Sequence, residues 1–320
     1  MKAKRILLAT LIATGLLLLS SLTLPANSPA SQEVLAAPIH QTHPMTPATN
    51  PGGSSSLANS PVSCPEPSGE CLASINWGGY AICAEPSTYC ADLEASPAPA
   101  PGPVTYVAGT WEVPRITTSF GTSCSDQENT WYDASVWVGI DGLFTQTVGQ
   151  TGTSSDCFYG QTSYYAWYEF YPEPSTTIST IEVKPGDSMT ASVTCTPVSG
   201  GADCSTTIKD VTNGESYTQP STFAPGALLE SAEWIEESAY YYGFLALTPV
   251  TPVSFTNTMA TINDVSRPIS GWGTSVYWLV MVTYDFPYVP FYQQSSMVKA
   301  EPSSLTRDGD FVSTWYSSGP

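Results

Sequence analysis

From about Ser74 to its end, the chain consists of short segments in which β-branched and aromatic residues alternate, separated by turn residues. Alternation with a period of two is typical of β-strands, whose successive side chains point to opposite faces. The segments that show it best are 104–108, 134–140, 163–171, 188–194, 276–284 and 310–316. After the N-terminal apolar run, no segment has the length and caps of a three-turn helix. The chain is therefore expected to be all-β, with antiparallel sheets packed as a sandwich.

The N-terminus predicts export. Three basic residues within the first five precede an apolar run over residues 6–24, and small residues and prolines follow. This order is that of a secretory signal, although the run is nearly long enough to span a bilayer, so an uncleaved anchor is the alternative. We assign 1–26 to the signal, 27–72 to a Pro/Ser-rich pro-segment or linker that cannot fold alone, and 73–320 to one catalytic β-sandwich domain. After signal removal the protein is expected to be secreted, monomeric and away from the membrane.

Turn residues and cysteines refine the expected domain. Lys184-Pro-Gly-Asp187 and Asn213-Gly214 are turn sequences between strand candidates. In an exported chain, eight cysteines at short spacings indicate disulfides. Their short spacing along the chain favours three disulfides, Cys64–Cys71, Cys83–Cys90 and Cys195–Cys204. The two cysteines that remain, Cys124 and Cys157, would then pair with each other. The Cys195–Cys204 pair would staple a hairpin with glycines at its tip.

The charge balance excludes one class of partner. From Ser74 onward, six basic side chains stand against 25 acidic ones, a net charge of −19. Nucleic acid binding needs clustered Lys and Arg, so nucleic acid is not an expected partner. A domain with so few cations also develops little self-repulsion when its carboxylates are protonated. The composition therefore favours either activity in acid or a generic acidic, extracellular surface.

Histidine is absent from the part of the chain that is expected to fold. Both histidines, His40 and His43, lie in the expected pro-segment. Ser-His-Asp and Cys-His catalytic arrangements, and zinc sites of the usual histidine-containing type, are therefore not expected. The sequence also has no P-loop and no GxGxxG pattern. We expect no metal and no cofactor, and any acid–base chemistry has to rely on carboxylates.

Two segments place carboxylates among aromatic residues. In 163–171, alternation puts Glu169 on one face with three aromatic residues, including Trp167, and Tyr168 on the other face, where it has no expected role. Either a binding wall or an ordinary amphipathic strand explains this pattern. In 230–237, four glutamates surround a Trp-Ile pair. There the local pattern does not decide between a strand, with Glu233 beside an isoleucine, and a helix.

Seven short motifs occur in one order along the chain. They are Asn76-Trp-Gly-Gly-Tyr-Ala81, Gly109-Thr-Trp-Glu-Val-Pro114, Trp137-Val-Gly-Ile-Asp-Gly142, Gln150-Thr-Gly152, Ala166-Trp-Tyr-Glu-Phe-Tyr-Pro172, Gly186-Asp187 and Ala232-Glu-Trp-Ile235. In this order, and in an acidic β domain, they resemble the secreted glutamic peptidases, or eqolisins. The resemblance covers about residues 77–260. It implies a bent sandwich of two large antiparallel sheets, a concanavalin-like jelly roll, with an acid-active endopeptidase site on its concave side.

The resemblance also implies site residues. Its catalytic pair would be Gln150, which directly precedes a Thr-Gly dipeptide, and Glu233; Gln146 is the alternative glutamine if the register is shifted. The supporting or substrate-binding residues would be Trp77, Trp137, Asp141, Trp167 and Glu169. As a turn residue, Asp141 is explained equally well by a structural role. The expected pro-segment has no Lys or Arg, unlike the basic pro-segments that are common in the family.

A Glu and a Gln suit peptide hydrolysis in acid. With an ordinary pKa near about 4.3, Glu233 would take a proton from water and then pass it to the leaving amine. Gln150 does not titrate, so its amide N–H can stabilise the oxyanion at any pH while its carbonyl orients the water. The substrate would be a protein or peptide. Glu230, Glu236 and Glu237 are expected to be solvated or supporting charges.

Two other functions fit parts of the sequence. A glycoside hydrolase on a jelly-roll sandwich could use Glu169 and Glu233 as paired carboxylates in an aromatic cleft. A non-catalytic sandwich could bind carbohydrate or protein on the same surface. The position of Gln150 relative to the two glutamates decides between the hydrolase chemistries.

Overall fold

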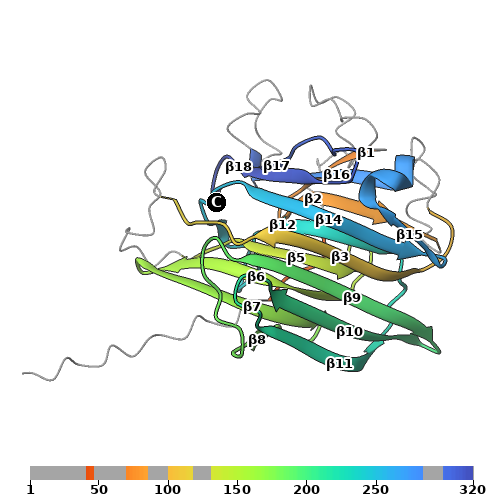
Figure 1. Cartoon of the computed structure of the whole chain (residues 1–320). Coiled ribbons are helices and arrows are strands. Elements are labelled where there is room, and N and C mark those ends of the chain that lie inside the picture. The colour runs from red at the N-terminus through yellow and green to blue at the C-terminus, as the bar shows by residue number, and fades with distance from the viewer. Residues whose placement is uncertain (1–40, 47–69, 86–99, 118–130, 284–297, 320) are drawn as a thin grey trace, which may run out of the picture. The chain divides into compact units, whose positions relative to one another are not determined.

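The computed structural model describes residues 41–46, 70–85, 100–117, 131–283 and 298–319. Nearly all regular structure in these ranges is β, which confirms the expected fold class (Figure 1). The strands of the first sheet, in the order in which they hydrogen-bond, are β8 (Thr176–Ile178), β7 (Gln161–Tyr171), β6 (Val148–Phe158), β5 (Ser135–Ile140), β12 (Ser231–Glu237), β2 (Trp77–Cys83), β16 (Val276–Val282) and β1 (Glu70–Ser74).

In the first sheet every neighbouring pair is antiparallel except β1 and β16, which are parallel, and in the second sheet every neighbouring pair is antiparallel. Its strands, in hydrogen-bonding order, are β11 (Ser216–Pro225), β10 (Gly201–Asp210), β9 (Ser188–Val198), β3 (Val104–Glu112), β14 (Val253–Ile262) and β18 (Phe311–Trp315). β17 (Val298–Pro302) pairs with both β16 and β18 and so joins the sheets. The remaining strands are β15 (Val265–Pro268), paired with β14, and β4 (Trp131–Asp133) and β13 (Ala246–Leu247), which pair with each other.

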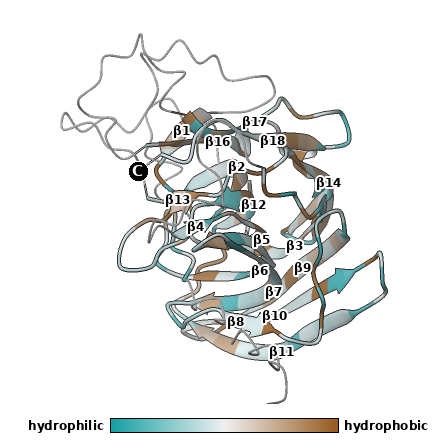
Figure 2. Ribbon diagram, turned by 90° about the vertical axis from the view of Figure 1, so that its left-hand side faces the viewer, coloured by the Kyte–Doolittle hydropathy of each residue, from teal (hydrophilic) through white to brown (hydrophobic). Residues whose placement is uncertain are grey.

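The two sheets pack face to face around one apolar core. β5 lies against β3 and β9, and β6 lies against β9 and β10, without hydrogen-bonding to them. The core is formed by inward-facing residues of both sheets, among them Val138, Trp234, Val193 and Phe255. Hydrogen bonds also cross it, since the Trp234 indole donates to the Ala108 carbonyl at 2.8 Å. Hydrophobic and hydrophilic residues follow one another along several of the strands (Figure 2).

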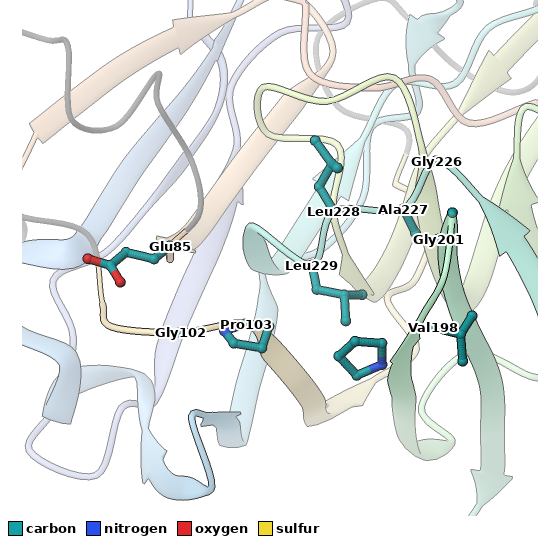
Figure 3. Close-up of a pocket in the computed structure, with 11 residues that line it drawn as sticks. Glu85, Gly102, Pro103, Val198, Gly201, Gly226, Ala227, Leu228 and Leu229 are labelled. Atoms are coloured by element: carbon teal, nitrogen blue, oxygen red, sulfur yellow. The ribbon is translucent and has the colours of Figure 1, made fainter.

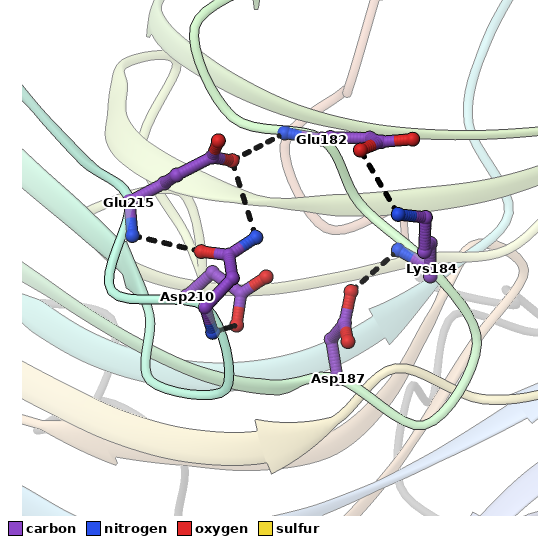
Figure 4. Close-up of polar contacts among 6 residues, drawn as sticks. Glu182, Lys184, Asp187, Asp210 and Glu215 are labelled. Carbon is purple, nitrogen blue, oxygen red and sulfur yellow. Dashed lines mark hydrogen bonds and ion pairs between the residues drawn. The ribbon is translucent and has the colours of Figure 1, made fainter.

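The predicted strands and turns are confirmed. Each of the six predicted strand segments overlaps an observed strand, and 231–237 is a strand and not a helix. In the Lys184–Asp187 turn, the Lys184 N–H donates to the Asp187 carboxylate at 2.7 Å. Nearby, the Glu182 N–H donates to the Glu215 carboxylate at 2.8 Å, and this links the turn to the β10–β11 connection (Figure 4). In the described ranges the one helical segment is a 3-10 helix over Ile269–Ser275, and none of their helices could cross a membrane.

The Cys195–Cys204 disulfide is confirmed. The two residues are direct partners in the β9–β10 ladder, so the bond staples the hairpin as expected. Cys71, Cys83 and Cys157 are disulfide-bonded as well. Their expected partners, Cys64, Cys90 and Cys124, lie outside the described residues, so those three pairings stay predictions.

Candidate functional site

The outer face of the first sheet carries a second apolar cluster. Trp77, Trp137 and Trp167 are fully buried there, together with Ile235 of β12. The rings of Trp77 and Trp137 meet edge to face, with centroids 4.9 Å apart. The three tryptophans therefore form one apolar wall, and Trp167 lies on the same face of β7 as Glu169, as alternation predicted.

A row of directly paired residues crosses this face. Glu233 on β12 pairs with Gly139 on β5, Gly139 pairs with Gln150 on β6, and Gln150 pairs with Glu169 on β7. Directly paired residues on neighbouring strands point to the same face of a sheet. With neighbouring strands about 4.8 Å apart, the backbones of Glu233 and Gln150 are about 10 Å apart. The register therefore places Glu233 and Gln150 on the same face of the first sheet.

Small residues flank Glu233 on both sides of the row. Its partner on β2 is Ala81, and its partner on β5 is Gly139. A Cβ atom on Gly139 would lie 2.7 Å from the Trp137 ring and 3.2 Å from the Gln150 Cβ atom. The absence of a side chain at Gly139 therefore lets the Trp137 ring lie directly over this position, beside the Gln150 side chain.

Gln150 and Glu169 interact directly with each other and with a third residue. The Gln150 Nε2 group donates to the Glu169 Oε2 atom at 2.9 Å and also to the Thr42 hydroxyl oxygen. The Thr42 hydroxyl in turn donates to Glu169 Oε2, so the three groups form a closed triangle. Burial raises the pKa of Glu169 to about 8, although the bonds from Thr42 and Gln150 oppose the rise. Glu169 is therefore a neutral acid in acidic solution.

Glu233 is fully buried, and neither of its carboxyl oxygens has a hydrogen-bond partner in the part of the chain that the structure describes. Burial raises the pKa of Glu233 well above its ordinary value, the Ser231 hydroxyl opposes this effect, and the nearby Asp141 charge adds to it. The expectation of an ordinary pKa for Glu233 is wrong for this state of the site. The reason is physical: an apolar surround disfavours an ionised carboxyl that receives little compensation.

Asp141 has a structural role in this structure. Its carboxylate accepts the backbone N–H groups of Leu228, Leu229 and Glu230, at 2.9, 3.0 and 2.7 Å. It thereby fixes the chain that leads into β12 and hence the start of the strand that carries Glu233. Burial raises the pKa of Asp141 to about 6 in spite of these three bonds.

The other glutamates of this stretch are not solvated, and that part of the expectation is wrong. Glu236 and Glu237 are fully buried, and Glu230 is 7% exposed. Glu237 lies on the same face as Glu233 and accepts the Trp137 indole N–H at 2.9 Å. Burial raises its pKa well above the ordinary value, and the backbone N–H of His43 opposes this. Alternation along the strand places Glu236 on the core side, where its carboxyl accepts a hydrogen bond from the Ser313 hydroxyl at 2.5 Å.

The structure adds a segment that sequence reasoning missed. Residues 41–46, inside the expected pro-segment, lie on the site face; Thr42 is fully buried and Met45 belongs to the apolar cluster. The expectation that the folded part has no histidine is wrong, because His43 contacts Tyr171, Tyr240 and Phe244. Its Nδ1 atom lies 3.1 Å from the Pro44 carbonyl oxygen. The segment has no periodicity or motif, so the sequence offered no signal for its position.

A separate pocket lies away from the row. It has a volume of about 680 Å³, and Val198, Leu228 and Leu229 are among its lining residues (Figure 3). None of the predicted site residues lines it. In the described ranges, no group of three or more His, Cys, Asp or Glu side chains is arranged to hold a metal ion.

Comparison with known proteins places the chain in a family. Aspergillopepsin-2 from Aspergillus niger is 36% identical over 173 residues, which are 49% of this chain and 60% of that protein. Scytalidopepsin B from Scytalidium lignicola is 41% identical over 104 residues, 32% of this chain and 38% of that protein. The chain thus spans less than two thirds of the length of these relatives.

The fold comparison agrees with the sequence comparison. The crystal structure of scytalido-glutamic peptidase with a transition state analog inhibitor has a TM-score of 0.54 at 20% identity, covering 75% of this chain and 98% of that chain. This likeness shows a shared fold. The model of the Peptidase A4 family matches residues 91–279, more than half of the 320 residues. The resemblance to glutamic peptidases is thereby confirmed, and the chain belongs to the Peptidase A4 family.

Proposed function

We propose that the protein is an acid endopeptidase that hydrolyses peptide bonds with Glu233 and Gln150. The observation that carries the proposal is the row across β12, β5 and β6, in which the two side chains face the same side with only a glycine between them. The named relatives, aspergillopepsin-2 and scytalidopepsin B, support the reaction class. A protein or unfolded peptide is the corresponding substrate.

The two side chains divide the chemistry. Gln150 already donates its Nε2–H to a hydroxyl oxygen, that of Thr42, which shows that the amide can hold an oxygen at this point of the face. In the reaction, the developing oxyanion takes such a position. Glu233 accepts the proton of the attacking water and then delivers it to the leaving amine. Burial holds Glu233 protonated, and contact with water when the site opens lowers its pKa toward the range in which it can act as a base.

Glu169 assists Gln150 and does not form a carboxylate pair with Glu233. In the row, Gln150 stands between Glu169 and Gly139, and its amide is bonded to Glu169. Glycoside hydrolysis needs two carboxyl groups facing one bond, about 5–5.5 or 6.5–9.5 Å apart. An amide placed between the two glutamates disfavours that arrangement. The bond to Glu169 fixes the direction of the Gln150 amide, which is a positioning role.

The finer parts of the proposal come from the sequence. The basic and apolar N-terminus supports secretion, with residues 1–26 as the signal and 27–72 as a pro-segment that precedes the catalytic domain. The acidic composition supports activity in acid. We infer a monomer that needs no cofactor.

Hydrolysis of acid-denatured casein by the full chain tests the proposal. At each pH between about 2 and 6, the range in which an exposed Glu titrates, the reaction is followed until the hydrolysis rate is constant. Glu233→Gln and Gln150→Ala are expected to lose at least 100-fold in rate, the scale of a lost proton carrier or oxyanion donor. The matched control is Gln146→Ala, because Gln146 is an exposed glutamine on the same segment. Full activity of either site variant, or loss in the control alone, would refute the assignment.

A further inference from the structure

We propose that Glu237 is a positioning residue for the peptidase reaction: its carboxyl holds the Trp137 indole, and the ring of Trp137 in turn restrains the side chain of Gln150. This inference rests on the proposed function, because it adds a residue to the same site. Its first support is a hydrogen bond between two fully buried side chains, from the Trp137 indole N–H to the Glu237 Oε2 atom at 2.9 Å.

Trp137 lies between Glu237 and the catalytic row. It pairs with Ile235 of β12, which stands midway between Glu233 and Glu237 on the same face of the strand. At about 3.3 Å per residue, the four residues from Glu233 to Glu237 span about 13 Å. Glu237 is therefore too far along the strand to act on the same peptide bond as Glu233, and Trp137 is the side chain that connects it to the row.

The Trp137 ring packs closely on the sheet because two of its neighbours are glycines. A Cβ atom on Gly139 would lie 2.7 Å from the ring and 3.2 Å from the Gln150 Cβ atom. A Cβ atom on Gly152, the direct partner of Trp137 on β6, would lie 2.5 Å from the Trp137 Cβ atom. The ring atoms over Gly139 belong to the benzene part of the indole, and the N–H group lies on the opposite edge. Glu237 therefore holds one edge of the ring, and the other edge borders Gln150.

The second oxygen of Glu237 fixes the direction of its carboxyl. Oε1 accepts the side-chain amide of Asn76 at 3.3 Å and the backbone N–H of His43 at 3.0 Å. Asn76 is itself held, because its amide oxygen accepts the Ser74 hydroxyl at 3.0 Å. The carboxyl is thus bonded through both oxygens, so the acceptor that faces the Trp137 indole has a defined position.

Gln150 is restrained from two sides in this arrangement. Glu169 accepts its amide N–H at 2.9 Å, which sets the direction of the donor. Trp137 limits where the first carbon of its side chain can move. A donor stabilises an oxyanion most when it is already in place, and a displacement of about 1 Å can cost about 100-fold in rate. Loosening the Trp137 ring should therefore lower kcat more than it raises KM.

The carboxyl of Glu237 serves this purpose at a cost in stability. Burial raises its pKa well above the ordinary value, and the bond from the His43 backbone opposes the rise. An apolar side chain at this position would continue the apolar wall of Trp137 and Ile235 without desolvating a carboxyl. In acid Glu237 is neutral, so it acts on the indole as a hydrogen-bond acceptor and not as a charge. A glutamine amide would offer the same acceptor.

Glu237→Met and Glu237→Gln in the full chain test these statements on a quenched fluorescent peptide at about pH 4. Methionine has a similar length and no comparable acceptor, so kcat should fall roughly tenfold or more while KM changes by less than about threefold. Glutamine restores the acceptor and should return kcat to within about threefold of the wild type. The matched control is Thr153→Val, because the Thr153 hydroxyl accepts the indole N–H of Trp111 at 2.9 Å in the core. This control loses the same kind of buried bond and should keep the wild-type kcat.

The indole N–H signals in nuclear magnetic resonance report the bond itself. In isotope-labelled protein the nine tryptophans give one such signal each, and Trp137→Phe identifies the signal of Trp137. An N–H that donates to an oxygen resonates downfield of a free one. The Trp137 signal should therefore move upfield in Glu237→Met and stay in place in Glu237→Gln, and Thr153→Val should move a different signal.

A double-mutant cycle shows whether Glu237 acts through Trp137. In the Trp137→Phe protein, Glu237→Met should lower kcat by less than about twofold, since the ring that it holds is already changed. A wild-type kcat in Glu237→Met with the Trp137 signal displaced would overturn the inference and leave the proposed function standing. A tenfold loss in Glu237→Gln with the signal in place would do the same, and this arm decides without the methionine variant. No hydrolysis by the wild type at any pH would overturn both.

Discussion

Glu236 offers a measurement of how burial changes the stability of this fold with pH. It lies on the core side of β12, fully buried, and its one described hydrogen bond is from the Ser313 hydroxyl at 2.5 Å. Burial raises its pKa to about 7, and the bond from Ser313 only partly opposes this. Glu236→Gln replaces the carboxyl by a neutral amide of the same shape, which imitates the protonated form at every pH.

The sign follows from comparing the folded and unfolded chains. Below about pH 4.5, Glu236 is protonated in both, so its contribution to stability is fully present. As the pH rises further, the unfolded chain ionises and is stabilised, while the folded chain stays protonated until about pH 7. At 1.36 kcal/mol per pKa unit, the wild type should lose about 3 kcal/mol through this one group. Asp141 and Glu169, with pKa values of about 6 and 8, shift stability in the same direction.

Urea unfolding at about pH 4 and about pH 8, at one ionic strength, measures this effect through the fluorescence of the nine tryptophans. The wild type should be much less stable at the higher pH. At low pH, the free energy of unfolding of Glu236→Gln should agree with that of the wild type within about 1 kcal/mol. Between low and high pH, the free energy of unfolding should decrease by about 3 kcal/mol less in the variant than in the wild type. Glu182→Gln, at an exposed ion pair with Lys184, should leave the profile unchanged. An equal loss in Glu236→Gln and wild type would refute the reasoning.

Two further substitutions test the geometry of the site. Gly139→Ala places a methyl group 2.7 Å from the Trp137 ring and 3.2 Å from the Gln150 Cβ atom, so these side chains must shift and kcat/KM should fall at least tenfold while circular dichroism still reports the folded sandwich. Unchanged kcat/KM would show that the close packing at Gly139 is not needed for the reaction. Asp141→Asn keeps a residue type that tolerates the φ of 73° at this position, but it replaces the carboxylate that accepts the three backbone N–H groups of 228–230 by an amide. Urea unfolding should therefore show a free energy of unfolding lower by about 2–4 kcal/mol. A decrease under about 1 kcal/mol would contradict the structural role of Asp141.

Much of the fold could be predicted because its determinants are local. Alternation in 163–171 places Glu169 and Trp167 on one face whatever the rest of the chain does, and the structure confirms this. The Cys195–Cys204 pair follows from a short hairpin, in which the two cysteines are direct neighbours across the ladder. Alternation could not choose strand or helix for 231–237, because both of its faces carry glutamates and apolar residues.

The site depends on contacts between distant parts of the chain. Glu233 and Gln150 came from a family resemblance, and the strand register then showed that Gly139 is what separates them. Burial of Glu236 and Glu237 was missed because a run of glutamates has the composition of a solvated surface. Only the packing of neighbouring strands removes water from these carboxyl groups and raises their pKa values.

By itself, then, the sequence determined the all-β class, the faces of single strands, the stapled hairpin and the acidic chemistry open to the domain. Each of these follows from residue type and spacing along a few residues. The tertiary structure decided that Glu233, Gln150 and Glu169 lie in one row with Gly139, that the Trp137 ring packs over this glycine, and that Thr42 is hydrogen-bonded to Gln150 and Glu169. Thr42 is 108 residues from Gln150, and no local pattern encodes a hydrogen bond across that separation.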